Sequence, residues 1–152
     1  MEISLAMIVA NLEDRRGAAA LEVADLERRL KLQRQRLDEL RGAPWWRPYR
    51  CYSRWRLRRA ERHTEAEWHE AAAQADAYGK ATEQVTQGRY DFAINLLRSL
   101  ATQVRLAGQA QVNLAQTLTE QGILLQQAEE LATELEAMAG HLEDLRAAKA
   151  RS

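Results

Sequence analysis

The sequence predicts an all-α fold, an elongated antiparallel coiled-coil helical hairpin. The first observation is a heptad repeat in residues 97–142, where apolar or small side chains recur every three or four positions for more than six heptads. The second is a similar repeat in residues 5–40. The third is a composition rich in Ala, Leu, Gln, Glu and Arg, with only nine aromatic residues. Such a chain buries narrow seams, so a thick core is not expected.

The repeat of residues 5–40 predicts the first helix. The apolar start, which includes Ile3, Leu5 and Ile8, lacks a basic leader and a small-residue cleavage site. We therefore interpret it as the beginning of a helix and not as a signal peptide. No stretch approaches 18 consecutive apolar residues, so no transmembrane segment is expected.

Two breaks follow this first repeat. Residues 42–48 read Gly-Ala-Pro-Trp-Trp-Arg-Pro, and each proline removes a backbone donor and disfavours helix in the residue before it. This segment is either a turn or a sharp kink. A helix is expected to resume at Tyr49, and its weaker, Ala-rich apolar stripe runs from Leu57 to Val85. The second break is expected at residues 87–89, where Gly88 accompanies a phase slip in the apolar pattern.

Two folds satisfy these breaks. In the one we favour, residues 1–152 form a single domain that turns once, near Gly88. Its first arm covers about residues 2–86, with a kink at residues 42–48, and its second arm covers about residues 90–147. In the alternative, an up-down-up three-helix bundle turns at both breaks.

Charge is unevenly distributed, although the 22 basic and 22 acidic residues cancel. Residues 28–62 contain thirteen Lys or Arg and three acids, whereas residues 106–145 contain seven acids and no Lys or Arg. Both folds place the acidic residues 129–144 opposite about residues 31–47, so we expect ion pairs there. Each exposed pair contributes well under about 1 kcal/mol, which can select an orientation but cannot hold the fold.

The aromatic–basic segment, residues 45–62, is the main candidate for function, because it interleaves seven Arg with five of the nine aromatic residues. Arginine binds carboxylates and phosphates, and aromatic side chains anchor protein contacts, stack on bases or sit at lipid interfaces. A structural alternative is that the aromatics fill the kink while the arginines meet the acidic arm. A nucleic-acid site usually accompanies an excess of positive charge, which this chain lacks. We predict a protein-binding surface made by Trp45, Trp46, Arg47, Tyr49, Arg50, Tyr52, Arg54, Trp55, Arg58 and Arg59.

Nothing in the sequence predicts catalysis, a metal site or a cofactor. The pairs His63–Glu67 and Glu65–His69 lie on neighbouring helix faces, whereas bundle carboxylate sites need Glu-x-x-His on two helices. No Ser–His–Asp or Cys–His arrangement and no glycine-rich phosphate loop is present. The single Cys51 excludes an internal disulfide and is typical of a reducing compartment. We expect a non-enzymatic, cytoplasmic protein.

Parts of the sequence resemble the FliJ/YscO family of stalk proteins. Residues 12–19, Leu-Glu-Asp-Arg-Arg-Gly-Ala-Ala, and the leucines that follow them resemble the first arm of that family. Residues 86–90, Thr-Gln-Gly-Arg-Tyr, and the Gln-rich helix after them resemble its turn and second arm. Residues 52–56, Tyr-Ser-Arg-Trp-Arg, are similar to aromatic–basic patterns in the family.

This resemblance implies a cytoplasmic coiled-coil hairpin of a type III secretion or flagellar export apparatus. Family members insert into the export ATPase ring and contact the export gate, so the partner would be one of those proteins. We expect a monomer or a weak dimer, because the two seams can bury each other within one chain. Two other functions stay open: binding of nucleic acid or an anionic membrane through residues 45–62, and an oligomeric scaffold.

Overall fold

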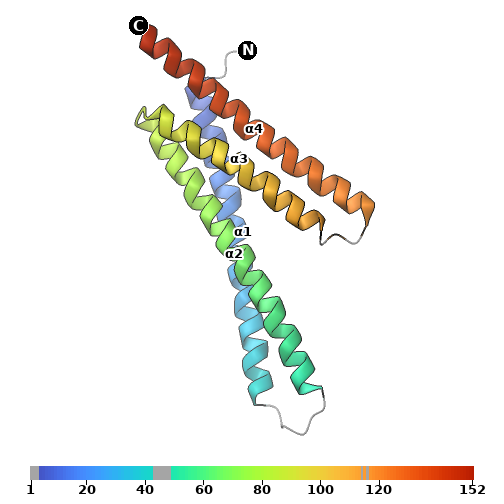
Figure 1. Cartoon of the computed structure of the whole chain (residues 1–152). Helices are drawn as coiled ribbons and strands as arrows, with labels where there is room; N and C mark the ends of the chain where they lie inside the picture. Colours follow the sequence, from blue (N-terminus) through green and yellow to red (C-terminus); the bar gives the residue numbers. More distant parts are fainter. Residues whose placement is uncertain (1–3, 43–48, 114, 116) are drawn as a thin grey trace. The chain divides into compact units, whose positions relative to one another are not determined.

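The computed structural model describes residues 4–42, 49–113, 115 and 117–152. These residues form four α-helices, α1 (Leu5–Arg41), α2 (Arg50–Thr86), α3 (Tyr90–Val112) and α4 (Leu118–Arg151), and no strand occurs among them (Figure 1). The predicted all-α class is confirmed. The chain divides into two compact units, which we call unit 1 (Met1–Asp14 with Ala77–Ser152) and unit 2 (Arg15–Asp76). None of the described helices is both long and apolar enough to cross a membrane.

Unit 2 is an antiparallel pair of helices, formed by most of α1 and most of α2 (Figure 1). Gln33 Nε2 donates to Thr64 Oγ1 at 3.1 Å, and Trp68 Nε1 donates to Glu27 Oε1 at 3.3 Å. Of the two α1 residues, Gln33 comes later in the chain than Glu27, yet its partner Thr64 comes earlier in α2 than Trp68. The two helices are therefore antiparallel, and the chain reverses between Arg41 and Arg50. This reversal agrees with the turn alternative and corrects the expectation of one kinked arm. The kink predicted at residues 42–48 falls almost entirely on residues 43–48, outside the described part.

Buried positions of α1 and α2 follow the predicted stripes. In α2, buried side chains recur every seven residues, at Thr64, Ala71, Tyr78 and Val85. The Thr64 hydroxyl donates to the carbonyl of Ala60 at 3.0 Å, which satisfies this polar group inside the seam. In α1, the buried apolar positions belong to the expected repeat or lie beside it: Ile8, Leu12, Ala19, Leu26 and Leu30.

The turn between α2 and α3 is confirmed where it was predicted. Gly88 has a φ of +74°, a conformation that glycine adopts without steric cost. Its N–H donates to the carbonyl of Val85 at 3.1 Å, and the N–H of Arg89 donates to the carbonyl of Gln84 at 2.9 Å. These bonds satisfy carbonyls that the end of α2 would otherwise leave unpaired.

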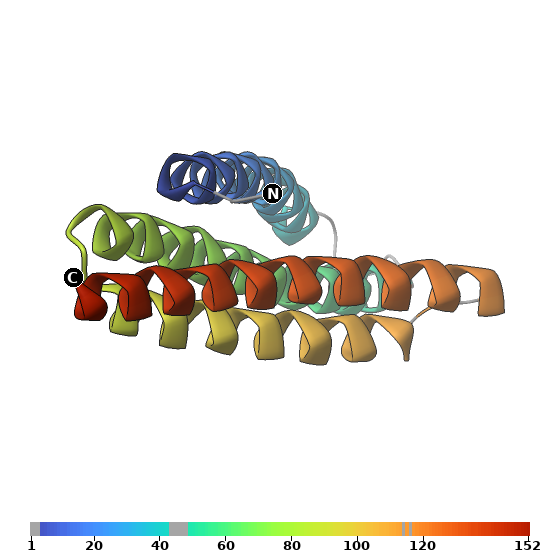
Figure 2. The same cartoon turned by 90° about the horizontal axis from the view of Figure 1, so that it is seen from above.

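The prediction of one continuous second arm at residues 90–147 is wrong, because a third turn divides it into two helices. This turn separates α3 from α4, which then lie side by side in antiparallel directions (Figures 1 and 2). Thr117 ends the turn: it is extended, with φ −127° and ψ 153°, and its hydroxyl accepts from the N–H of Glu120 at 3.2 Å. Leu114, which belongs to the predicted repeat of residues 97–142, lies outside the described residues.

Folding back lets the first half of the long seam bury against the second half. Leu97, Leu100, Leu135 and Leu142 are at most 2% exposed, whereas Leu118, in the middle of the seam, is 86% exposed. The core of unit 1 is completed by buried residues of all four helices: Ile8, Leu12, Tyr78, Ala81, Val85, Ala93, Ile94, Ala101, Val104, Ala132, Met138 and Ala139.

Candidate interaction surface

Three acidic residues of α4, Glu129, Glu136 and Glu143, form ion pairs with arginines of α3 within unit 1. Arg105 binds Glu129 through two parallel bonds, with Nη2–Oε1 at 3.0 Å and Nε–Oε2 at 3.1 Å, and it also pairs with Glu136. Arg98 Nη2 lies 2.7 Å from Glu143 Oε1. Hydrogen bonding to Arg105 lowers the pKa of the carboxyls of Glu129 and Glu136 below the usual range.

These contacts correct the predicted pairing of residues 129–144 with residues 31–47. The physical reason is the third turn, which brings α3 and its arginines alongside α4. Glu129, Glu136 and Glu143 are therefore already bound by Arg105 and Arg98. The arginines of residues 45–62 need another explanation.

The described aromatics of the predicted surface are exposed. Tyr49 is 78% exposed, Tyr52 61% and Trp55 56%. Arg58 and Arg59 are exposed as well, while Arg50 and Arg54 are half-buried. Trp45, Trp46 and Arg47 lie outside the described residues. Exposure of Tyr52 and Trp55 argues against the alternative in which these side chains fill a kink.

Three of these exposed side chains, Tyr52, Trp55 and Arg59, lie along one side of α2 together with the exposed Arg62. The rings of Tyr52 and Trp55 lie 6.3 Å apart between centroids, at an interplanar angle of 31°. Arg59 Cζ lies 5.5 Å from the centroid of the Trp55 ring, within the range of a cation–π contact. Arg62 continues the spacing of three and four residues, which keeps all four on one side of the helix. We call Tyr52, Trp55, Arg59 and Arg62 the aromatic–arginine face.

A basic groove of about 340 Å³ lies beside this face, between α1 and α2. Arg54 and Arg58 line it from α2, and Arg34 and Arg41 line it from α1. Two carboxylates neutralise the α1 side: Arg34 Nε lies 3.0 Å from Glu61 Oε1, and Arg41 Nη1 lies 3.7 Å from Asp38 Oδ1.

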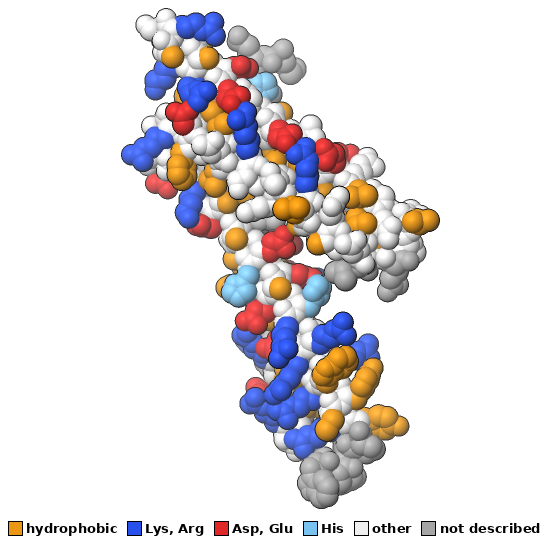
Figure 3. Space-filling model, in the orientation of Figure 1, with side chains coloured by type: hydrophobic (Ala, Val, Ile, Leu, Met, Phe, Trp, Pro, Cys, Tyr) orange, Lys and Arg blue, Asp and Glu red, His pale blue; other side chains and the backbone are white. Residues whose placement is uncertain are grey.

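Most arginines of α2 have no anionic partner among the described residues. Among the residues that the structure describes, no carboxylate pairs with Arg54, Arg56, Arg58, Arg59 or Arg62. Figure 3 shows Lys and Arg side chains gathered with hydrophobic ones near this end of unit 2. This end of the helix pair is therefore a positively charged surface with exposed aromatic rings.

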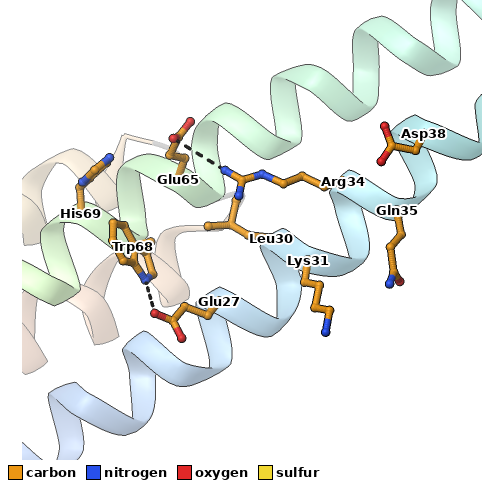
Figure 4. Close-up of a pocket in the computed structure, with 9 residues that line it drawn as sticks. All are labelled: Glu27, Leu30, Lys31, Arg34, Gln35, Asp38, Glu65, Trp68 and His69. Atoms are coloured by element: carbon orange, nitrogen blue, oxygen red, sulfur yellow. Dashed lines mark hydrogen bonds and ion pairs between the residues drawn. The ribbon is translucent and has the colours of Figure 1, made fainter. Parts of the chain in front are cut away.

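A second groove, of about 510 Å³, lies further along the same two helices (Figure 4). Leu30 and Trp68 form its apolar floor, and charged side chains of both signs surround them. Arg34 Nη2 reaches Glu65 Oε1 at 3.9 Å. His69 lines this groove and lies edge-on to the Trp68 ring at 4.9 Å. The mixed charges around this groove favour no single ligand charge.

The histidines do not assemble a metal site in the described part of the chain, where no group of three His, Cys, Asp or Glu could hold an ion. His63 Nε2 lies 2.9 Å from Glu67 Oε1, as its spacing of four residues predicts. Cys51 is exposed near the start of α2.

The described residues thus define an all-α protein with an exposed aromatic–arginine face and an adjoining basic groove. Comparisons with protein-family models, curated proteins and solved structures found no match to this chain.

Proposed function

We propose that the protein is a non-enzymatic helical adaptor that binds a protein partner through the aromatic–arginine face. The observation that carries this proposal is the exposed Trp55 ring, which lies beside the Tyr52 ring and makes a cation–π contact with Arg59. Trp, Tyr and Arg are the residue types enriched in the few positions that dominate protein interfaces. An exposed cluster of all three has little to contribute to the stability of the free protein.

The resemblance to the FliJ/YscO family suggests one form of this adaptor. In that form the protein is a cytoplasmic stalk of a type III secretion or flagellar export apparatus, and its partner is an export ATPase ring or an export-gate protein. We propose a monomer or a weak dimer, since α3 and α4 bury much of the long seam within one chain, including Leu97, Leu100, Leu135 and Leu142.

A second candidate is binding of nucleic acid. The observation that favours it is that exposed aromatic rings lie beside arginines for which the described residues supply no carboxylate, an arrangement that also suits single-stranded nucleic acid. Phosphate contacts weaken steeply as salt is added, so a salt titration of binding distinguishes this candidate from a protein contact that is dominated by aromatic burial.

Capture of partners from a native lysate tests the proposal. We expect the double variant Tyr52→Ala/Trp55→Ala to retain wild-type helical circular dichroism and to capture the partner about tenfold less well or worse, as loss of a hot spot implies. Phe92→Ala is the matched control, because Phe92 is an aromatic residue that is 57% exposed and belongs to α3 of unit 1, not to the aromatic–arginine face of α2. Nuclease treatment should leave capture unchanged. Unchanged capture by the double variant, or release of the bound material by nuclease, would overturn the proposal.

A further inference from the structure

The exposed side of α2 has the spacing of a coiled-coil seam. Positions 52, 55, 59 and 62 alternate by three and four residues, which is the a/d spacing of a heptad repeat. Ala66 continues the same line, and all five side chains are exposed. Unlike the buried seams of this chain, the line carries two aromatic residues followed by two arginines. A second helix lying along it would meet apolar surface first and positive charge next.

Charge along α2 is divided into two segments. Residues 50–62 contain six Arg and a single acid, whereas residues 63–76 contain four acids and no Lys or Arg. The positive segment is about 20 Å long, at about 1.5 Å per residue. A long polyanion or an anionic membrane would also meet the acidic segment, which would repel it. A short partner whose negative charge is confined to one stretch avoids this repulsion.

Ion pairs between α3 and α4 provide an example of how one helix binds arginines of another within this protein. On α3, Arg98 and Arg105 are seven residues apart, and on α4 their partners Glu129, Glu136 and Glu143 follow the same interval. Each guanidinium meets a carboxylate from the facing helix. Arg59 and Arg62 also lie on one side of their helix, although they are three residues apart and not seven, and no carboxylate among the described residues pairs with either of them.

We propose that the aromatic–arginine face binds an acidic amphipathic α-helix of the partner protein. The partner helix packs apolar side chains against Tyr52 and Trp55 and places glutamates or aspartates, three or four residues apart, against Arg59 and Arg62. Arg54 and Arg58, which line the adjoining groove, donate hydrogen bonds to further carboxylates at the edge of the partner helix. This inference rests on the proposed protein-binding function and names the chemistry of the partner.

A designed peptide of three heptads tests the inference with the full-length chain. The probe carries Leu and Glu on the side that faces α2, and a second peptide of the same composition scatters them around the helix. We expect fluorescence anisotropy to show binding of the first peptide and much weaker binding of the second. Arg59→Glu/Arg62→Glu should weaken binding of the first peptide by about tenfold or more. The control Arg28→Glu/Arg36→Glu makes the same charge change on α1 and should have little effect.

Exchanging the charges of the peptide and of Arg59 and Arg62 provides the most stringent test. A peptide with Lys in place of Glu should bind Arg59→Glu/Arg62→Glu better than it binds the wild type, which also shows that the variant is folded. If Arg59→Glu/Arg62→Glu and the control Arg28→Glu/Arg36→Glu weaken peptide binding equally, the attraction is a non-specific charge effect and the inference fails. Tighter binding of a single-stranded oligonucleotide or of anionic vesicles than of the peptide would also overturn it. If neither peptide binds while Tyr52→Ala/Trp55→Ala still abolishes capture from lysate, the adaptor function stands and the acidic helix is rejected.

Discussion

Gly108 of α3 lies at a close approach to α4. A Cβ atom added at this residue would lie 2.5 Å from the Cβ of Ala128, a non-bonded separation that Cβ atoms essentially never show. We expect Gly108→Ala to force the two helices apart and to destabilise the protein by about 1–3 kcal/mol. Urea unfolding monitored by circular dichroism measures this change.

Gly122→Ala is the matched control for that substitution. Gly122 lies within α4, and nothing lies within 4 Å of an added Cβ. Here alanine gains helix propensity without a clash, so stability should rise by up to about 1 kcal/mol. Stabilisation by both substitutions would mean that α3 and α4 are not in close contact at Gly108.

The sequence predicted many buried residues but not the role of Gly108. Leu97, Leu100, Leu135 and Leu142 belong to the heptad seam, and all four are buried as the repeat predicts. Gly108 falls off that seam, so the repeat gives it no contact. Its neighbour Ala128 is twenty positions away, and the two meet only because the chain turns between them.

At the scale of elements, the third turn was the largest departure from prediction. Residues 113–117 contain no glycine or proline, and the heptad phase passes through them without a slip. Periodicity alone cannot show such a turn, because the same seam serves one long helix or two helices that pack on each other. One local signal was present: Thr117 and Glu120 have the Thr-x-x-Glu spacing of a capping box at a helix start.

The α3–α4 pair makes a prediction about pH. Arg105 lowers the pKa of Glu129 and Glu136 in the folded protein, so its stabilising effect is present above the unfolded pKa of these carboxyls. The effect is lost as the pH falls through their folded pKa values. We therefore expect Arg105→Gln to lower the melting temperature at pH 7, and we expect the difference from wild type to shrink in acid and in high salt.

Arg89→Gln is the control for this series. Arg89 has an exposed side chain just before α3 and no carboxylate partner in the described part of the chain. Its substitution should change the melting temperature little at any pH. A deficit of Arg105→Gln that persists unchanged at low pH would show that the arginine acts by packing its aliphatic stem and not by its charge.

At the scale of the whole molecule, the division into two units coincides with a division of charge. Residues 15–76 contain fifteen Lys or Arg and ten acids, a net charge of +5, and the rest of the chain contains seven and twelve, a net charge of −5. The unevenness was visible in the sequence. Its assignment to separate units was not, because the expected pairing of residues 129–144 with residues 31–47 would have mixed the two charges.

Because of this separation of charge, the protein should bind both positively and negatively charged resins. At pH 7 and low ionic strength, a protein of zero net charge with evenly spread charges would pass through charged resins. We expect this one to be retained on both a cation exchanger and an anion exchanger, and to elute from each at moderate salt. Flow-through on both resins would contradict the expectation. By the same reasoning its solubility should rise when salt is first added, because salt screens the attraction between oppositely charged units of neighbouring molecules.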